Sequence, residues 1–206
     1  PGLVQFLRLR KQRIAIFASG AGTNAAALVK HFADSSVAEI AWVGCNRPAD
    51  QAGIYERLRK LGMEVGPFDR RAFLDGEVQD ALEAFEVDWV VLAGFLWRIP
   101  KEMIAAFPNR MVNVHPALLP DFGGQGMYGH HVHRAVSASG RTETGITVHH
   151  VTADYDEGPP IFQVRCSIEP GEAPELIAQK VQELEHRYLP SVVEQLIENS
   201  SQTASS

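Results

Sequence analysis

An asparagine and a histidine two positions apart are the first residues of this chain whose types and spacing could do chemistry. Asn113 and His115 stand in "RMVNVHP", at the end of an apolar run that reads as a strand. Side chains two apart on a strand point to the same face. An amide can donate a hydrogen bond to a developing oxyanion, and an imidazole can move a proton near neutral pH. A structural pair that only caps the strand is the alternative interpretation.

An acidic loop follows further along the chain. The segment "TADYDEGPP", residues 152–160, holds Asp154, Asp156 and Glu157 ahead of a glycine and two prolines. A carboxylate of this loop placed against His115 would raise the imidazole pKa and select its tautomer. With an amide beside them, and no serine or cysteine nucleophile in a suitable motif, these groups indicate direct acyl transfer without a covalent intermediate. The alternative is that the acidic residues of this loop are simply solvated and have no role in catalysis.

A glycine-rich loop lies directly after the first predicted strand. The motif "FASGAGTNAA", residues 17–26, fits the G-x-G-x-x-G/A spacing of dinucleotide-binding loops. The free N–H groups and the dipole of the helix that follows favour a bound anion. A nicotinamide dinucleotide usually needs an acidic residue after the second strand, and "CNRP" at 45–48 supplies none. The side chains of Thr23 and Asn24 suit a single phosphate, so the loop favours a phosphomonoester, with a dinucleotide or an unliganded turn as alternatives.

Clustered histidines make a metal site a further alternative. They are His130, His131 and His133, and the pair His149 and His150. No cysteine or acidic ligand falls at a matching spacing, and two histidines two apart on a helix point their rings in different directions. We therefore predict no metal, and we expect at least one histidine of "VHHV" to pack in the core.

Apolar runs alternate with helical patterns along the first half of the chain. We expect strands at residues 13–19, 39–46, 63–68, 87–95 and 110–115, separated by helices at 21–33, 49–62, 70–86 and 101–107. This alternation predicts right-handed βαβ units and a parallel sheet, with the most apolar strand, 87–95, at its centre. The second half should hold a helix at 127–140, antiparallel strands at 144–151 and 161–170, and a long helix at 173–199 that Pro190 kinks or breaks.

The predicted fold class is therefore α/β: a Rossmann-like, mostly parallel sheet flanked by helices, with a smaller mixed C-terminal part and an antiparallel strand. We expect one domain over residues 13–200, with a phosphate-binding half at about 13–110 and a catalytic half at about 111–200. A cleft should separate the halves. Residues 1–12 and 200–206 are expected to be flexible ends.

Composition limits the classes of partner. The chain has 206 residues and a formal net charge of -6, which argues against nucleic acid as the main partner. No run reaches the roughly 18 to 20 apolar residues of a membrane helix. Two cysteines cannot form a disulfide framework, and a cytoplasmic location fits them.

Five motifs together resemble a known family. "SGAGTN", "LAGF", "NVHPALLP", "DYDEGP" and "QELEHRYLP" occur in this order between about Arg13 and Leu196. They are similar to the folate-dependent formyltransferases, most closely to the members that act on glycinamide ribonucleotide in de novo purine synthesis. The resemblance implies that the substrate amine attacks the formyl carbon of 10-formyltetrahydrofolate. It also implies that Asn113 and protonated His115 stabilise the tetrahedral oxyanion, while Asp156 keeps His115 charged and helps to move protons.

The resemblance also assigns binding residues. On the substrate side, they hold phosphate and ribose: Gly22, Thr23, Asn24, Pro116, Gln182 and Glu185. On the folate side, they line the pterin slot: Leu96, Trp97, Arg98, Ile99, Val151, Thr152 and Asp154. The implied partners are these two small molecules, in a monomer or homodimer without metal. Alternatives are another folate-dependent formyltransferase, a formyltetrahydrofolate hydrolase, or a dinucleotide-binding redox protein.

Overall fold

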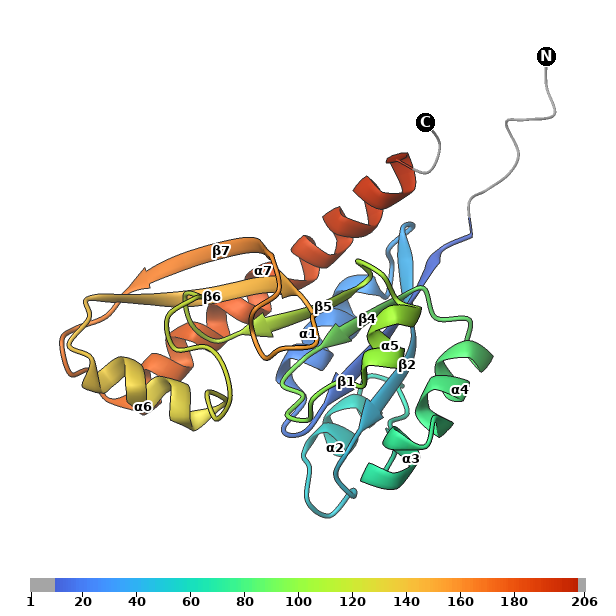
Figure 1. Ribbon diagram of the computed structural model, residues 1–206, viewed down its shortest axis with the longest axis horizontal. Helices are drawn as coiled ribbons and strands as arrows, with labels where there is room; N and C mark the ends of the chain where they lie inside the picture. Colours follow the sequence, from blue (N-terminus) through green and yellow to red (C-terminus); the bar gives the residue numbers. More distant parts are fainter. Residues whose placement is uncertain (1–9, 204–206) are drawn as a thin grey trace.

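The computed structural model describes residues 10–203, which form one seven-stranded sheet with helices on both faces (Figure 1). The strands are β1 (Gln12–Ala18), β2 (Ala38–Cys45), β3 (Gly66–Pro67), β4 (Trp89–Leu92), β5 (Met111–His115), β6 (Glu143–His150) and β7 (Pro160–Ser167). The helices are α1 (Thr23–Phe32), α2 (Ile54–Arg59), α3 (Arg70–Leu74), α4 (Glu77–Ala84), α5 (Lys101–Ala106), α6 (His130–Ala138) and α7 (Pro174–Thr203). None of the helices within this range combines the length and the apolar character of a membrane span.

The order of the strands is β3-β2-β1-β4-β5-β6-β7. β1 pairs in parallel with β2 and β4, and β5 pairs in parallel with β4, whereas β6 and β7 run antiparallel. The mostly parallel sheet, its antiparallel addition and the central place of β4 are confirmed. All four residues of β4 are buried, as expected for a central strand that is covered on both faces.

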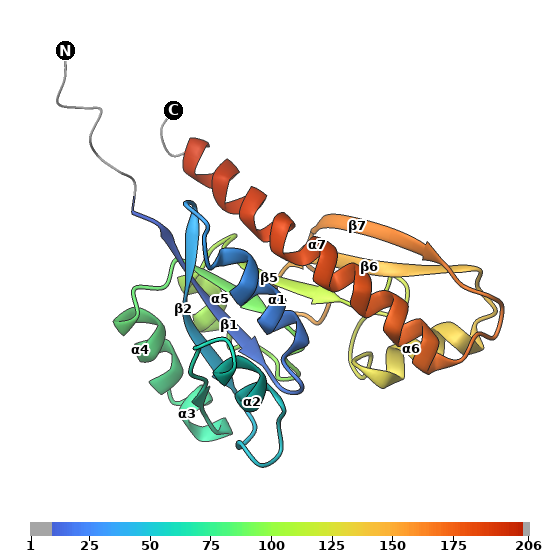
Figure 2. The ribbon, with the colours of Figure 1, turned by 180° about the vertical axis from the view of Figure 1, so that it is seen from behind.

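Two hydrophobic cores lie on the two faces of the sheet. Successive side chains of β1 alternate between them, with Ile14 and Ile16 in one core and Ala15 and Phe17 in the other. The first core lies under α1 and α7, which run along the face shown in Figure 2. The second core lies under α3, α4 and α5. The sheet is therefore a rigid platform, and the loops at its strand ends are free to carry chemistry.

Several predicted helices have different limits in the structure. The helix expected at 70–86 is two helices, because Gly76 adopts a left-handed conformation (φ 94°) that interrupts the helical path. α2 begins at Ile54 rather than at residue 49, and β3 is reduced to two residues. Short-range patterns locate these elements but not their ends.

The last helix runs without interruption through Pro190 to Thr203, so the predicted break is wrong. Leu189 and Val193 on either side of the proline are fully buried, and their burial outweighs the hydrogen bond that proline cannot make. Residues 200–203 of the end that was expected to be flexible belong to this helix. The remaining parts of the predicted ends, 1–9 and 204–206, lie outside the described residues, whereas β1 already begins at Gln12.

The glycine loop joins β1 to α1 through a residue with left-handed backbone. Gly22 has φ 69° and is the N-cap of α1. A Cβ atom at Gly22 would lie 2.4 Å from Cγ1 of Ile54 at the start of α2. The glycine is therefore required by the backbone conformation and by the close packing of α2 against the loop.

Replacing Gly22 with alanine should destabilise the protein by about 1 to 3 kcal/mol, because the new methyl group meets both a strained backbone and Ile54. Gly20 is the matched control, since its Cβ would meet nothing within 4 Å and its φ lies outside the left-handed region. Chemical denaturation of both variants measures the difference. Equal stabilities would show that the loop relaxes around a side chain at Gly22.

Candidate active site

A cavity of about 670 Å³ opens at the C-terminal ends of β1, β4 and β5. Open α/β sheets place their ligands at this edge. The cavity collects almost all of the residues that the sequence predicted for a site. They are Asn24, Leu96, Trp97, Arg98, Ile99, Asn113, His115, Pro116, Val151, Thr152, Asp154, Asp156, Gln182 and Glu185. Gly22 and Thr23 do not line this cavity, although Gly20 of the same loop does.

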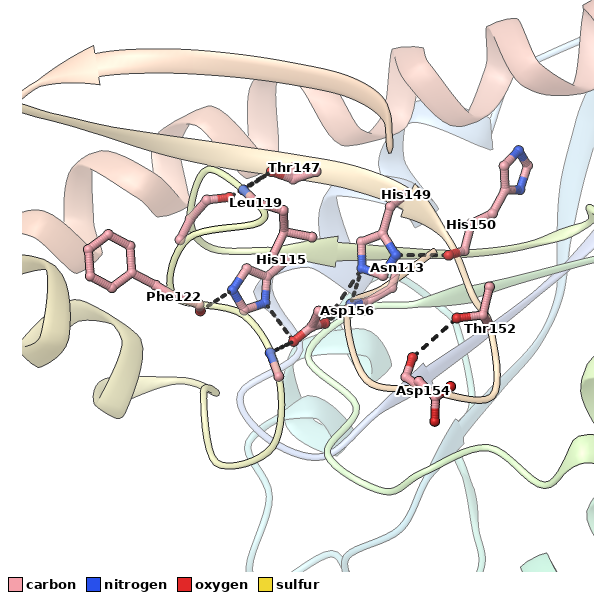
Figure 3. A network of polar contacts seen from close by, with 12 residues as sticks. Asn113, His115, Leu119, Phe122, Thr147, His149, His150, Thr152, Asp154 and Asp156 are labelled. Atoms are coloured by element: carbon pink, nitrogen blue, oxygen red, sulfur yellow. Dashed lines mark hydrogen bonds and ion pairs between the residues drawn. The ribbon is translucent and has the colours of Figure 1, made fainter. Parts of the chain in front are cut away.

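The three residues predicted to be catalytic meet at one point of the cavity (Figure 3). Asn113 and His115 project from the end of β5, and Asp156 comes from the loop between β6 and β7. Oδ2 of Asp156 lies 3.4 Å from Nδ1 of His115, and Nδ2 of Asn113 donates to its Oδ1 at 3.4 Å. The structure thus brings an amide, an imidazole and a carboxylate into direct contact.

Asp156 is held in place by its backbone and by several donors. It is one of the few non-glycine residues with positive φ (56°), and the backbone N–H of Gly124 donates to its Oδ2 at 3.0 Å. Burial alone would raise the pKa of this carboxyl. The side chain of His149, the charge of His115 and the N–H of Gly124 outweigh burial, and the pKa lies below its ordinary value. Asp156 is therefore a buried carboxylate that is ionised at neutral pH.

His115 is flanked by two hydrogen-bond acceptors. Its Nε2 donates to the carbonyl oxygen of Phe122 at 2.8 Å, while its Nδ1 faces Asp156. The ring is almost completely buried, and burial lowers its pKa, although Asp156 and the Phe122 carbonyl act in the opposite direction. The sequence predicted a raised pKa because it could not weigh desolvation. The structure instead gives an imidazole that is neutral at rest and has a carboxylate beside its open nitrogen.

His149 is a member of the site that the sequence did not identify. One histidine of "VHHV" was expected in the core, and His149 is indeed buried, but β5 and β6 pair it directly with Asn113. Its Nδ1 donates to the carbonyl oxygen of His150 at 2.8 Å, so its Nε2 accepts the amide hydrogen of Asn113 at 3.1 Å. Both amide hydrogens of Asn113 are thus engaged, one with His149 and the other with Asp156. Only the register of the two strands could have revealed this contact.

The loop that precedes α6 closes the other side of the trio. Phe122 supplies the carbonyl oxygen that holds His115, and Gly124 supplies the N–H that holds Asp156. Buried Thr147 anchors the start of this loop, because its hydroxyl accepts from the N–H of Leu119 at 3.0 Å and donates to the carbonyl oxygen of Ala117 at 2.7 Å. No sequence motif predicts these contacts, because backbone groups make most of them.

The glycine-loop end of the cavity holds a second carboxyl group, that of half-buried Glu185. Nδ2 of Asn24 donates to Oε2 of Glu185 at 2.9 Å, so the amide expected on a phosphate contacts this carboxyl group instead. Burial raises the pKa of Glu185 to about 7, and the hydrogen bond from Asn24 acts against this rise. Thr23 lies outside the cavity but accepts a hydrogen bond from Nε2 of Gln182 at 3.2 Å.

The opposite end of the cavity has an apolar wall with a polar edge. The segment 95–99 and Val151 supply its apolar surface, and the indole of Trp97 packs against Phe68, Phe73 and Phe95. Arg98 donates to the carbonyl oxygen of Ala153 at 2.6 Å and pairs with Asp154 at 3.0 Å. These bonds tie the segment after β4 to the loop after β6. The space between them suits a flat ring system with polar edges.

The clustered histidines do not form a metal centre in the part of the chain that the structure describes. Within residues 10–203, no group of three or more His, Cys, Asp or Glu side chains is arranged to hold a metal ion. His133 is buried and lines the cavity, and burial, with the nearby charges of His130 and His115, lowers its pKa to about 4. The absence of a metal from the reaction stays a prediction.

Comparisons with known proteins point to one family. The family model described as formyl transferase matches residues 12–193. The chain is 37% identical over 189 residues to a phosphoribosylglycinamide formyltransferase, chloroplastic, of Arabidopsis thaliana, covering 89% of this chain and 65% of the plant protein. It is 31% identical to the phosphoribosylglycinamide formyltransferase of Bacillus subtilis, covering 90% of this chain and 95% of that protein. The crystal structure of glycinamide ribonucleotide transformylase 1 from Symbiobacterium toebii superposes with a TM-score of 0.83 at 32% identity, covering 92% of this chain and 89% of that one.

The carboxyl group of Glu185 should make the stability of the protein depend on pH. Its folded pKa of about 7 lies above the ordinary 4.5, so the folded protein holds this proton more tightly than the unfolded chain does. Stability is therefore lost as the pH rises from about 4.5 to about 7. We expect Glu185→Gln to remove this loss and to stabilise the protein at pH 8 by roughly 2 kcal/mol.

Glu183→Gln is the control, because Glu183 is exposed on the same helix. Urea denaturation of both variants and the wild type at several pH values measures the effect. If the Glu185→Gln variant kept the full pH dependence of the wild type between pH 5 and 8, Glu185 would not be the group that titrates.

Proposed function

The chain belongs to the formyl transferase family, and from this membership we propose that it transfers a formyl group from 10-formyltetrahydrofolate to the amine of glycinamide ribonucleotide, a step of de novo purine synthesis. The observation that carries the proposal is the contact of Asn113, His115 and Asp156 in the middle of one cavity. The names of the relatives from Arabidopsis thaliana and Bacillus subtilis support the choice of acceptor. The cavity lining supports a reaction between two ligands, because the trio lies between the Glu185 end and the segment 95–99.

We place glycinamide ribonucleotide at the end that holds Glu185 and Gln182. A buried carboxylate is a suitable acceptor for sugar hydroxyls, and an amide side chain can donate to a phosphate oxygen. The pterin of the folate lies at the other end, between the segment 95–99 and the loop 151–154, whose apolar side chains and backbone groups suit a flat heterocycle. The amine and the formyl group then meet beside the trio.

In the first step, the amine nitrogen attacks the formyl carbon, and the carbonyl π electrons move to oxygen. Asn113 can donate to this oxyanion if it gives up the longer of its two contacts, the 3.4 Å contact with Asp156. His149 keeps the other amide hydrogen at 3.1 Å and so preserves the orientation of the side chain. A donor whose side chain is already oriented needs little reorganisation to stabilise the oxyanion.

The attacking amine must lose a proton, and the His115–Asp156 pair is placed to receive it. His115 is neutral at rest because burial lowers its pKa, and a proton that arrives at Nδ1 lies between the ring and the carboxylate. The resulting imidazolium is adjacent to the oxyanion and opposes its charge. Return of the proton to N10 of the folate, directly or through water, lets tetrahydrofolate leave with the electron pair of the broken C–N bond.

The remaining features of the proposal concern the whole molecule. The substrates are small molecules and the reaction needs no metal. We place the protein in the cytoplasm as a monomer or homodimer, although plant relatives carry the word chloroplastic in their names. Because the chain spans 65% of the length of the Arabidopsis protein, the activity is assigned to this chain as a proposal rather than carried over with the name.

An assay with both substrates tests the proposal. Transfer is followed by the absorbance change of the folate, with glycinamide ribonucleotide or its dephosphorylated ribonucleoside as acceptor, and binding of NADPH is titrated separately. We expect turnover with the ribonucleotide, much weaker use of the ribonucleoside, and no specific binding of NADPH. Tight binding of NADPH without formyl transfer would instead support a dinucleotide-binding redox protein.

The role of Asp156 can be isolated with Asp156→Asn. Asparagine adopts the left-handed conformation readily, so the fold should be retained, but the charge beside His115 is lost. We expect kcat to fall by roughly 10²-fold to 10³-fold. The neighbouring Glu157→Gln, which changes an exposed carboxylate outside the cavity, should behave as the wild type. A turnover within a factor of two of the wild type for Asp156→Asn would remove Asp156 from the mechanism.

A further inference from the structure

The two edges of the sheet differ in how well they are protected against pairing with another chain. At one edge β3 has only two residues, and the neighbouring β2 carries an extra residue, Ala41, that has no partner in β1. Very short edge strands and bulges hinder the addition of a further strand. β7 forms the opposite edge (Figure 1), and its eight residues pair with β6 in a register that is regular from Phe162 to Ser167. This edge therefore has the form of a template for another strand.

Alternate backbone groups of β7 point away from β6. Ile168, directly after β7, donates its N–H to the carbonyl oxygen of Thr142 at 3.0 Å, and every second residue pair of an antiparallel ladder is bonded in this way. The N–H and C=O groups of Gln163 and Arg165 therefore face the open edge. No backbone group of residues 10–203 pairs with them on that side. They are the donors and acceptors that an added strand would use.

The hydrophobic core is also open along this edge. Ile146 and Val148 of β6 are fully buried, whereas Val164 and Phe162, their partners on β7, are only half-buried. The half-buried ring of Tyr188 on α7 extends this apolar row, because its centre lies 5.4 Å from that of Phe162. An added strand would cover apolar surface as well as satisfy the backbone, and both changes favour association.

The sequence of β7 is complementary to a second, antiparallel copy of itself. A two-fold axis at Val164 places Gln163 opposite Arg165 of the other copy, so the outward backbone groups of these two residues pair with each other. On the face that α7 covers, Val164 meets its own copy and Phe162 lies opposite Cys166. This register opposes no like charges and brings apolar residues together at its centre.

Other registers of the same pairing are less favourable. An axis at Arg165 would place the two guanidinium groups directly opposite each other, and like charges in that position are destabilising. At the end of the ladder, Ser167 already gives its carbonyl oxygen to Nζ of Lys180 at 3.2 Å, so the pairing is best centred away from it. The charges and the hydrogen bonds of the edge thus select the axis at Val164.

We propose that β7 is the interface of a homodimer, in which two copies pair antiparallel about Val164 and join their sheets into one. The inference goes beyond the proposed function, since it involves neither substrate. Both cavities stay accessible in such a dimer, because no residue of β7 lines the cavity. The pairing also supports the hairpin of β6 and β7, whose loop carries Asp156. One strand pair with a short apolar row is a small interface, so the dimer dissociates on dilution.

Sedimentation of three proteins over a series of concentrations tests the proposal. The proteins are the wild type, Arg165→Pro and Arg165→Gln. Proline removes an N–H that faces the open edge and leaves the ladder with β6 intact. Glutamine is the matched control, because it loses the same side chain and the same exposed ion pair with Glu143 but keeps the N–H. We expect the wild type and Arg165→Gln to dimerise with similar affinity, and Arg165→Pro to dimerise more weakly by roughly tenfold or more.

A cross-linking experiment decides the question even if Arg165→Pro does not fold. In Val164→Cys, made together with Cys166→Ser, the two new thiols face each other at the axis, where side chains of a non-hydrogen-bonded pair lie close together. With a mild oxidant added, we expect a covalent dimer on a non-reducing gel. The wild type should give none, because its Cys166 lies opposite Phe162 and not opposite its own copy.

Three results would overturn the proposal. The first is a wild type that stays monomeric at every concentration, including a monomer that pairs with some other protein at this edge. The second is a folded Arg165→Pro variant that dimerises as tightly as Arg165→Gln. The third is cross-linking of the wild type through Cys166 without cross-linking of Val164→Cys. None of these measurements depends on formyl transfer, so a failure of the proposed function leaves them unaffected.

Discussion

The arrangement of the site depends on one buried negative charge, that of Asp156. An ionised carboxylate that is largely shielded from water is stable only if donors surround it. Here two donors come from different segments: Asn113 from β5 and the backbone N–H of Gly124 from the loop before α6. The rings of His149 from β6 and of His115 from the end of β5 lie beside the carboxylate and complete its surroundings. Each segment is therefore held in position by a charge that the proposed reaction also uses.

The topology of the sheet brings these segments together. β5 is the last parallel strand, and β6 runs back along it, so the end of β6 lies beside the start of β5 and His149 pairs with Asn113. The loop after β6 then turns back over the edge where the parallel strands end, and there it meets the segment after β4 that we assign to the folate. The bonds from Arg98 to Ala153 and Asp154 close this contact. The strand pairing and the loops that build the fold are thus the same ones that build the site.

Much of this could be predicted from the sequence, but only where a local pattern carried the information. Alternation of apolar runs and turn residues located every strand, and the spacing of Asn113 and His115 on one strand placed them on one face. The pairing of Asn113 with His149, the bond between Asn24 and Glu185, and the position of Thr23 outside the cavity depend on contacts between distant segments. No periodic pattern in the sequence predicts these long-range contacts. The pKa of His115 was misjudged for the same reason, because the sequence shows the nearby carboxylate but not the depth of burial.

The most direct test concerns the coupling between His115 and Asp156. Nuclear magnetic resonance of histidines labelled with ¹⁵N gives the pKa of His115 in the wild type and in Asp156→Asn, with His115→Gln to assign the signal. We expect the wild-type pKa to lie below the ordinary 6.5, because burial dominates, and to fall further in Asp156→Asn, because the charge that favours the imidazolium is gone. An unchanged or higher pKa in the variant would contradict the claim that these two side chains share a proton.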